Sequence, residues 1–177
     1  MIIYKTGDIF KSSAQVITNP VNCVGVMGKG LALAFKKKYP SMYKDYKSLC
    51  NNNGLLPGQP TLWENEEVQI LNFPTKRHWK DKSLLSDIEE GLKFLAKNYA
   101  KMGISSLAMP PIGCGLGGLY WQDVKTILNQ YLGEIEDLDV YVYESKVSAK
   151  KSHNNNDNAD HEVPLNSLKD EGLVALT

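Results

Sequence analysis

Residues 19–30 read Asn-Pro-Val-Asn-Cys-Val-Gly-Val-Met-Gly-Lys-Gly, a glycine-rich stretch between a predicted strand and a predicted helix. β-Branched residues predict the strand over Val16–Thr18, and an apolar run followed by lysines predicts the helix over Leu31–Lys38. A loop in this place brings exposed backbone N–H groups to the positive end of a helix dipole. The stretch therefore predicts an α/β unit that binds an anion at the carboxyl edge of its sheet.

A second glycine-rich loop occupies the same kind of place between a strand and a helix. Residues 110–119 read Pro-Pro-Ile-Gly-Cys-Gly-Leu-Gly-Gly-Leu and join a predicted strand, Leu107–Met109, to a predicted helix, Trp121–Leu132. Glycine lets the backbone approach a phosphate because it has no Cβ and tolerates positive φ. Either loop alone is equally compatible with a plain connection, but two at one sheet edge indicate a diphosphate held from both sides.

The rest of the chain alternates between segments of strand and helix character, which is typical of a sheet covered by helices. The helices over residues 31–38 and 42–51 are separated at Pro40, which disfavours helical geometry at Tyr39. Gly103 is placed to end the longest helix. The further predicted strands are Ile2–Tyr4, Val68–Phe73 and Val140–Tyr143, and the further helices are Met42–Asn51 and Leu84–Lys101.

Composition excludes several classes of protein. With 177 residues, 42% hydrophobic and 23% charged, the chain fits one globular domain with a tail and neither a membrane protein nor a disordered one. No export signal is recognisable at the start, so we expect a cytoplasmic protein. Its three cysteines lack CxxC spacing, which favours reduced thiols over a disulfide framework or a metal site. The chain has no GxxxxGK[ST] motif, and the first loop lacks GxGxxG spacing, which disfavours P-loop kinases and Rossmann dehydrogenases.

Charge and texture vary along the chain although the net charge is zero. Lysines are concentrated in the first 47 residues and densest at Lys36–Lys38, where either a solvated helix face or a contact with a phosphate-rich partner is compatible with the pattern. Residues 145–177 are polar and without period, so we predict a domain over 1–144 and a disordered tail after it. Residues 165–176 within that tail suit either a short helix on a partner or a frayed end.

Four motifs in order resemble those of the macrodomain family. They are Gly7-Asp8-Ile9-Phe10, then Asn19-Pro20-Val21-Asn22 with Gly28-Lys29-Gly30-Leu31-Ala32, then Asn72-Phe73-Pro74-Thr75-Lys76-Arg77-His78-Trp79, and Met109-Pro110-Pro111-Ile112-Gly113-Cys114-Gly115-Leu116. Within the family they are most similar to the DarG antitoxin branch of DNA ADP-ribosyl glycohydrolases, which is related to the terminal ADP-ribose protein glycohydrolases. The resemblance implies a three-layer α/β/α fold with a mixed, mostly parallel sheet of about six strands and helices on both faces.

The resemblance also implies a role for individual positions in holding ADP-ribose. Asp8 and Ile9 match residues beside the adenine, Asn22 matches a polar residue near the distal ribose, and Tyr143 matches an aromatic residue near the adenine. Each position has a structural alternative: Asp8 as a turn or cap residue, Asn22 as a partner for loop backbone, and Tyr143 as core. The phosphate and ribose contacts implied are Val26, Met27, Gly28, Lys29, Gly30, Leu31, Thr75, Pro111, Ile112, Gly113, Cys114, Gly115, Leu116, Gly117, Gly118 and Leu119.

Lys76 matches the catalytic lysine of this branch, although by composition alone it would be an ordinary surface lysine. The resemblance implies that its amine attacks C1″ and opens the distal ribose as a covalent adduct, which water then releases. Such an attack requires the neutral amine. We expect His78 and Trp79 to form a wall of the site. No metal or cofactor is implied.

The sequence departs from the protein-directed relatives after the second loop. Those relatives carry an acidic residue there, whereas this chain has Gly117 and Gly118, as in the DNA-directed branch. This departure puts a mechanism with a paired lysine and carboxylate in doubt. The candidate substitutes for the missing carboxylate are Glu64, Glu66, Asp81 and His78.

These observations predict an ADP-ribosyl glycohydrolase that removes ADP-ribose from thymidine in DNA. The alternatives left open are a reader that binds ADP-ribose without turnover and a hydrolase of protein-linked ADP-ribose or of ADP-ribose 1″-phosphate. The expected partners are ADP-ribose, ADP-ribosylated DNA and a cognate ADP-ribosyltransferase toxin, and we expect a monomer. Because longer DarG antitoxins carry a further domain that engages the toxin and the sequence ends in a polar tail, direct neutralisation of the toxin is not expected.

Overall fold

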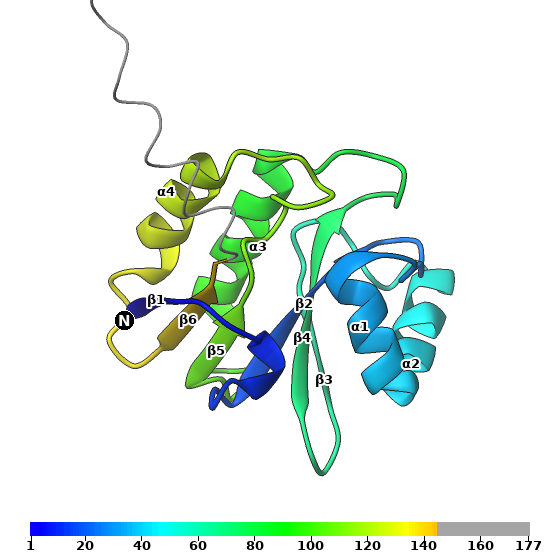
Figure 1. The fold of residues 1–177 in the computed structure, drawn as a ribbon, viewed down its shortest axis with the longest axis horizontal. Helices are drawn as coiled ribbons and strands as arrows, with labels where there is room; N and C mark the ends of the chain where they lie inside the picture. Colours follow the sequence, from blue (N-terminus) through cyan, green and yellow to red (C-terminus); the bar gives the residue numbers. More distant parts are fainter. Residues whose placement is uncertain (145–177) are drawn as a thin grey trace, which may run out of the picture.

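The computed structural model describes residues 1–144, in which six strands form one sheet between two layers of helices (Figure 1). The strands are β1 (Ile2–Lys5), β2 (Val16–Asn22), β3 (Thr61–Glu64), β4 (Gln69–Lys76), β5 (Ser106–Met109) and β6 (Asp139–Tyr143). The helices are α1 (Gly30–Lys38), α2 (Pro40–Asn51), α3 (Leu85–Asn98) and α4 (Trp121–Leu132), with one 3₁₀ turn, η1 (Ile9–Lys11). The predicted tail over 145–177 lies outside the described residues.

The strand order in the sheet is β1-β6-β5-β2-β4-β3, and only β3 runs antiparallel to its neighbour. β5, β2 and β4 are neighbours in the sheet and run parallel, so their carboxyl ends reach the same edge. In open sheets of this kind, ligands bind outside the carboxyl ends of the strands. The topology therefore brings both glycine-rich loops to one edge.

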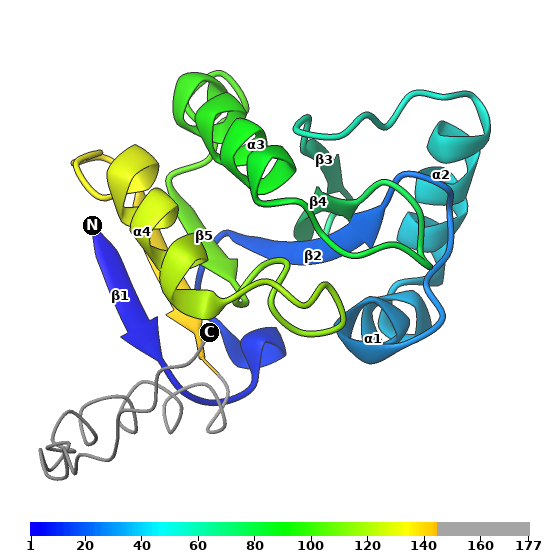
Figure 2. The ribbon, with the colours of Figure 1, turned by 90° about the horizontal axis from the view of Figure 1, so that it is seen from above.

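The period of two along each strand sends neighbouring side chains to opposite layers. Val16 and Leu71 pack with residues of α3 and α4, whereas Ile17 and Ile70 pack with residues of α1 and α2. The view from above shows α3 and α4 on one side of the sheet and α1 on the other (Figure 2). The three-layer α/β/α prediction is confirmed.

Two strands extend three or more residues past their predicted ends, because both continue through a proline. β2 continues through Pro20 to Asn22, and β4 continues through Pro74 to Lys76. Proline lacks an N–H and is tolerated in a strand where no neighbour needs that donor. β2 pairs with β5 only at Val16 and Ile17, so its side facing β5 is open at Pro20.

The edge strand β3 was not predicted. Its four residues pair antiparallel with β4 through a short hairpin, in which the Asn65 side chain accepts hydrogen bonds from the N–H groups of Glu67 and Val68. Four residues are too few to display a clear alternation, so tertiary pairing with β4 defines this strand. The observed helix α3 is shorter than the predicted helix over 84–101, because α3 ends at Asn98 before a turn that includes Gly103 at φ 72°.

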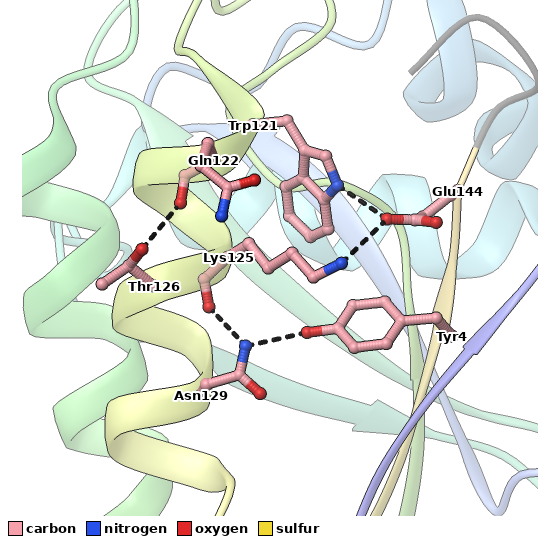
Figure 3. Close-up of polar contacts among 7 residues, drawn as sticks. All are labelled: Tyr4, Trp121, Gln122, Lys125, Thr126, Asn129 and Glu144. Atoms are coloured by element: carbon pink, nitrogen blue, oxygen red, sulfur yellow. Dashed lines mark hydrogen bonds and ion pairs between the residues drawn. The ribbon is translucent and has the colours of Figure 1, made fainter. Parts of the chain in front are cut away.

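A cluster of polar and aromatic side chains connects the edge strand β1 and Glu144, the residue after β6, to α4 (Figure 3). Glu144 accepts a hydrogen bond from Trp121 Nε1 at 2.7 Å and lies 3.7 Å from Lys125 Nζ. Lys125 Nζ in turn lies 3.9 Å from the ring centroid of Tyr4, whose hydroxyl accepts from Asn129. These contacts hold the start of α4, and with it the end of the second glycine-rich loop. No helix within residues 1–144 is long and apolar enough to cross a bilayer.

Candidate functional site

A cleft of about 830 Å³ opens at the carboxyl ends of β2, β4 and β5, a volume suited to a nucleotide-sized ligand. Both glycine-rich loops and the segment after β4 contribute residues to its lining. The lining residues are Pro20, Val21, Asn22, Val26, Gly28, Lys29, Gly30, Leu31, Ala32, Thr75, Lys76, Trp79, Lys80, Pro110, Pro111, Gly113, Cys114, Gly115, Leu116 and Gly117.

Two rows of backbone donors line this cleft. Within residues 1–144, the N–H groups of 30–32 at the start of α1 donate to no protein acceptor. The N–H groups of 115–117 in the second loop have no acceptor in that part of the chain either. The loops approach each other closely, since a Cβ built on Gly30 would lie 3.6 Å from Leu116 Cδ1. Unpaired donors at a helix start, with a second set in the same cleft, suit a phosphate-rich anion.

Lys76 is the last residue of β4 and lies beside Asn22, its register partner in β2. The N–H of Cys23 donates to the carbonyl of Lys76 at 3.1 Å, which ties the ends of the two strands together. The Lys76 amine donates to the carbonyl oxygen of Trp79 at 3.4 Å. The backbone of Lys76 is therefore fixed against the end of β2, and its amine contacts the backbone of Trp79.

Asn22 uses its side chain to shape the first loop. Its Nδ2 donates to the carbonyl of Val26 at 2.6 Å, and its Oδ1 accepts from the N–H groups of Val24 and Val26 and from the hydroxyl of Tyr46. Asn22 is therefore a hydrogen-bond partner for the loop backbone, which was the structural alternative to a role in ligand binding. The residue also lines the cleft, so it positions the loop where the distal ribose is expected.

Arg77 follows Lys76 but is engaged elsewhere. Its guanidinium forms a two-pronged ion pair with Asp87 in the first turn of α3, at 2.9 and 3.0 Å. This contact raises the pKa of Arg77 through the hydrogen bonds and the charge of Asp87. The pair fixes the segment between β4 and α3, and therefore the backbone that carries Trp79.

The second loop has no room for a side chain at Gly117. A Cβ there would overlap Ser83 Oγ and the carbonyl of Gly113. The N–H of Ser83 also donates to the carbonyl of Gly117 at 3.0 Å, so the two segments are in close contact. The missing carboxylate of the second loop is therefore excluded by packing as well as by sequence.

Cys114 lines the cleft but is not suited to act as a nucleophile. Burial raises the pKa of its thiol to about 11, and the charge of Asp123 adds to that effect. A thiol with this pKa stays protonated near neutral pH, and the thiolate is the reactive form. Among the lining residues, the amines of Lys29, Lys76 and Lys80 remain as candidate nucleophiles or cations.

The structure places two thirds of the predicted site residues on the cleft and the others behind or beside it. Met27 and Ile112 are buried in the core and support the loops, and Leu119 packs against that core. Asp8 caps η1 by accepting from the N–H of Phe10, and Ile9 is buried. The predicted site residues that do not line the cleft are Asp8, Ile9, Met27, Ile112, Gly118, Leu119 and Tyr143.

None of the four candidate substitutes for the loop carboxylate lines the cleft. Glu64 and Glu66 belong to the β3–β4 hairpin at the amino end of β4, which is the opposite end of that strand. His78 stacks on Trp79, with ring centroids 5.6 Å apart, and Asp81 is exposed. Within residues 1–144, no group of three or more His, Cys, Asp or Glu side chains is placed to hold a metal ion.

Sequence reasoning missed several residues of the lining. Pro20 and Val21 were assigned to a loop, but they form the carboxyl end of β2 and present it to the cleft. Lys80 lies in a segment without periodicity, where only a folded chain can show which side chains face the ligand. The lining residues that were not predicted are Pro20, Val21, Ala32, Lys80 and Pro110.

The chain is similar to proteins of known activity over this same region. The family model described as Macro domain matches residues 18–128. A DNA ADP-ribosyl glycohydrolase of Mycobacterium tuberculosis is 39% identical over 147 residues, which cover 81% of this chain and 42% of that protein. The chain thus spans less than half the length of this relative.

The fold is also similar to the solved structures of macrodomains. The macrodomain of Mycobacterium tuberculosis DarG superposes with a TM-score of 0.78 at 39% identity, covering 81% of this chain and 97% of that one. DarTG of Thermosipho africanus in complex with ADP-ribose superposes with a TM-score of 0.75 at 40% identity, covering 80% of this chain and 41% of that one. The chain therefore belongs to the Macro domain family.

Proposed function

We propose that this chain binds ADP-ribose in the cleft and removes it from thymidine in modified DNA. One observation carries the proposal: residues 30–32 and 115–117, whose backbone N–H groups have no acceptor within residues 1–144, line one cleft together with Lys76. The rows suit a diphosphate, and the amine lies where a sugar attached to that diphosphate would extend.

Relatives support the same assignment. The Mycobacterium tuberculosis protein is named a DNA ADP-ribosyl glycohydrolase, and the Thermosipho africanus structure holds ADP-ribose. The second of these belongs to a fusion of a DNA ADP-ribosyl transferase with a DNA ADP-ribosyl glycohydrolase. A cognate transferase toxin is therefore the partner we propose, and we propose that the chain works as a monomer in the cytoplasm.

The adenine end of the ligand is assigned with the help of the resemblance. Asp8, Ile9 and Tyr143 lie at the carboxyl ends of β1 and β6, which reach the same sheet edge as β5. We propose that the adenine extends from the diphosphate site toward these residues. The Asp8 carboxylate, which already accepts from the N–H of Phe10, has a second oxygen to accept from the exocyclic amine.

The reaction uses Lys76 as nucleophile. Its neutral amine forms a bond to C1″ of the distal ribose, the bond from C1″ to the base breaks, and the base leaves with that electron pair. The proton lost by the amine is taken up by the departing base. Water then attacks C1″ of the adduct, the bond from C1″ to the Lys76 nitrogen breaks, and the nitrogen takes up a proton from the water, which yields ADP-ribose and restores the lysine. No carboxylate among the lining residues is available to assist, so the nearby backbone must position the amine.

The test is to incubate the purified protein with ADP-ribosylated single-stranded DNA and, separately, with ADP-ribosylated protein, and to separate the products by chromatography. We expect release of free ADP-ribose from the DNA. Binding of ADP-ribose without release from either substrate would contradict the enzyme assignment and favour a reader.

A further inference from the structure

Trp79 is unlike the other two tryptophans of the chain. Trp63 and Trp121 are half-buried, and their indole N–H groups donate to Asp45 and Glu144. Trp79 lines the cleft, is 48% exposed and has no acceptor for its indole N–H within residues 1–144. Packing and hydrogen bonding therefore do not explain a tryptophan at this position, whereas a ligand at the rim would.

The surroundings of Trp79 are basic and aromatic. Lys80 Nζ lies 5.1 Å from the centroid of the Trp79 ring, and His78 stacks on the ring at an interplanar angle of 29°. The side chain of Lys82 lies next to Gly118, where a Cβ would be 3.3 Å from Lys82 Nζ. Asp81 is the one acid between these lysines. An exposed aromatic ring with lysines in the same segment is the combination that proteins use to stack a base and hold its phosphates.

Trp79 is also close to the reacting end of the cleft. Its carbonyl accepts from the Lys76 amine at 3.4 Å, so the two residues share one short segment after β4. A group that leaves C1″ when Lys76 attacks must depart beside this segment. The ion pair of Arg77 with Asp87 keeps the segment in place. Lys80 and Lys82 are exposed and form no ion pair within residues 1–144.

We propose that Trp79 stacks against the nucleobase that carries the ADP-ribose, while Lys80 and Lys82 contact phosphates of the DNA strand on either side. Trp79 is then the residue that makes the enzyme select modified DNA over modified protein, since a protein offers no base to stack. The inference rests on the proposed function and adds a specificity-determining residue to it.

The test compares Trp79→Ala and Trp79→Phe with the wild type. For Trp79→Ala we expect KM for an ADP-ribosylated single-stranded oligonucleotide to rise about tenfold, the effect of losing one stacked base. The Kd for free ADP-ribose should stay within about twofold, because Trp79 contacts the base and not the diphosphate. Trp79→Phe should recover most of the loss. Tyr120→Ala, which removes another exposed aromatic ring outside the lining, should change neither value.

A second measurement separates stacking from turnover. In the Lys76→Ala background, the modified oligonucleotide should bind more tightly than free ADP-ribose and should quench tryptophan fluorescence beyond the effect of ADP-ribose. Both differences should disappear on adding Trp79→Ala. Lys80→Gln with Lys82→Gln should reduce the salt dependence of oligonucleotide binding, because fewer phosphates are neutralised.

The outcomes distinguish the two proposals. If the wild type binds no ADP-ribose or releases none from DNA, the proposed function fails. The role of Trp79 is overturned if the wild type releases ADP-ribose but Trp79→Ala leaves KM for the oligonucleotide unchanged. It is also overturned if Trp79→Ala raises the Kd for free ADP-ribose by the same factor as KM for the oligonucleotide. In both cases the proposed function stands.

Discussion

At the scale of the residue, Lys76 carries the proposed chemistry, and two substitutions test it in different ways. Lys76→Ala should lower the rate of ADP-ribose release from modified DNA by at least about 100-fold, the lower end for a reacting side chain. ADP-ribose should still bind, since the backbone donors of the loops are unchanged. Single-turnover assays and calorimetry measure the two quantities separately.

Lys76→Arg tests nucleophilicity against charge. A guanidinium keeps its positive charge under all working conditions and does not attack carbon, so this variant should be about as inactive as Lys76→Ala. Retention of most of the wild-type rate would mean that Lys76 acts as an electrostatic clamp on the phosphates. The covalent mechanism would then be wrong, although the cleft would remain the binding site.

Gly28 and Gly115 allow the loops to be blocked without disturbing the fold. A Cβ at Gly115 would meet no atom within 4 Å, a Cβ at Gly28 would meet only Val26 Cγ1 at 3.8 Å, and neither glycine has a positive φ. We expect Gly28→Val and Gly115→Val to abolish ADP-ribose binding because the added branch occupies the cleft, while Tm changes little. Titration calorimetry and thermal melts check this, and full affinity in both variants would place the phosphates elsewhere.

Not all glycines of the second loop suit that experiment. Gly113 has φ 75°, and a Cβ there would lie 2.8 Å from Leu119 Cδ1. A substitution at Gly113 or Gly117 would therefore disturb the fold and the binding together. Only the tertiary structure separates the glycines that face the ligand from those that face the core.

At the scale of the element, the close contact between α3 and β4 determines where the end of β4 lies. Gly91 in α3 faces the ring of Phe73, and a Cβ at Gly91 would overlap that ring. Gly91→Ala gains up to about 1 kcal/mol of helix propensity. Overpacking costs about 1–3 kcal/mol, so we expect a net loss of stability in urea denaturation.

Two controls accompany the Gly91 variant. Ser86→Ala changes an exposed position of the same helix and should not destabilise the protein. Phe73→Leu combined with Gly91→Ala should lose less stability than the sum of the single changes, since the smaller side chain leaves room for the methyl group. Additive losses would show that Gly91 and Phe73 do not constrain each other.

At the scale of the whole molecule, ligand binding should stabilise the fold. A ligand that binds only the folded state adds about 2.7 kcal/mol at a concentration of 100 Kd. ADP-ribose should therefore raise Tm, and AMP should raise it less because it lacks the second phosphate and the distal ribose. Thermal melts with both ligands measure this, and the absence of a shift at millimolar ADP-ribose would contradict binding in the cleft.

The sequence by itself determined the layers, the helices and the two loops. Helical periodicity, together with Pro40 and Gly103 as residues that interrupt helices, predicted four helices within a few residues of their observed bounds, because these signals are local. Glycine-rich loops between strand and helix indicated an anion site for the same reason. The motif that contains Lys76 indicated the reacting end through a resemblance to the macrodomains rather than through its composition.

Tertiary structure decided which residues meet. β3 forms because it pairs with the free edge of β4. β2 continues through Pro20 because β5 does not pair with β2 at that position, so no hydrogen bond to β5 is lost. Glu64 and Glu66 looked available for catalysis in the sequence, but strand direction puts them at the far end of the sheet from the cleft. Local signals fix how a segment folds, whereas pairing order and packing between distant segments fix which side chains face the ligand.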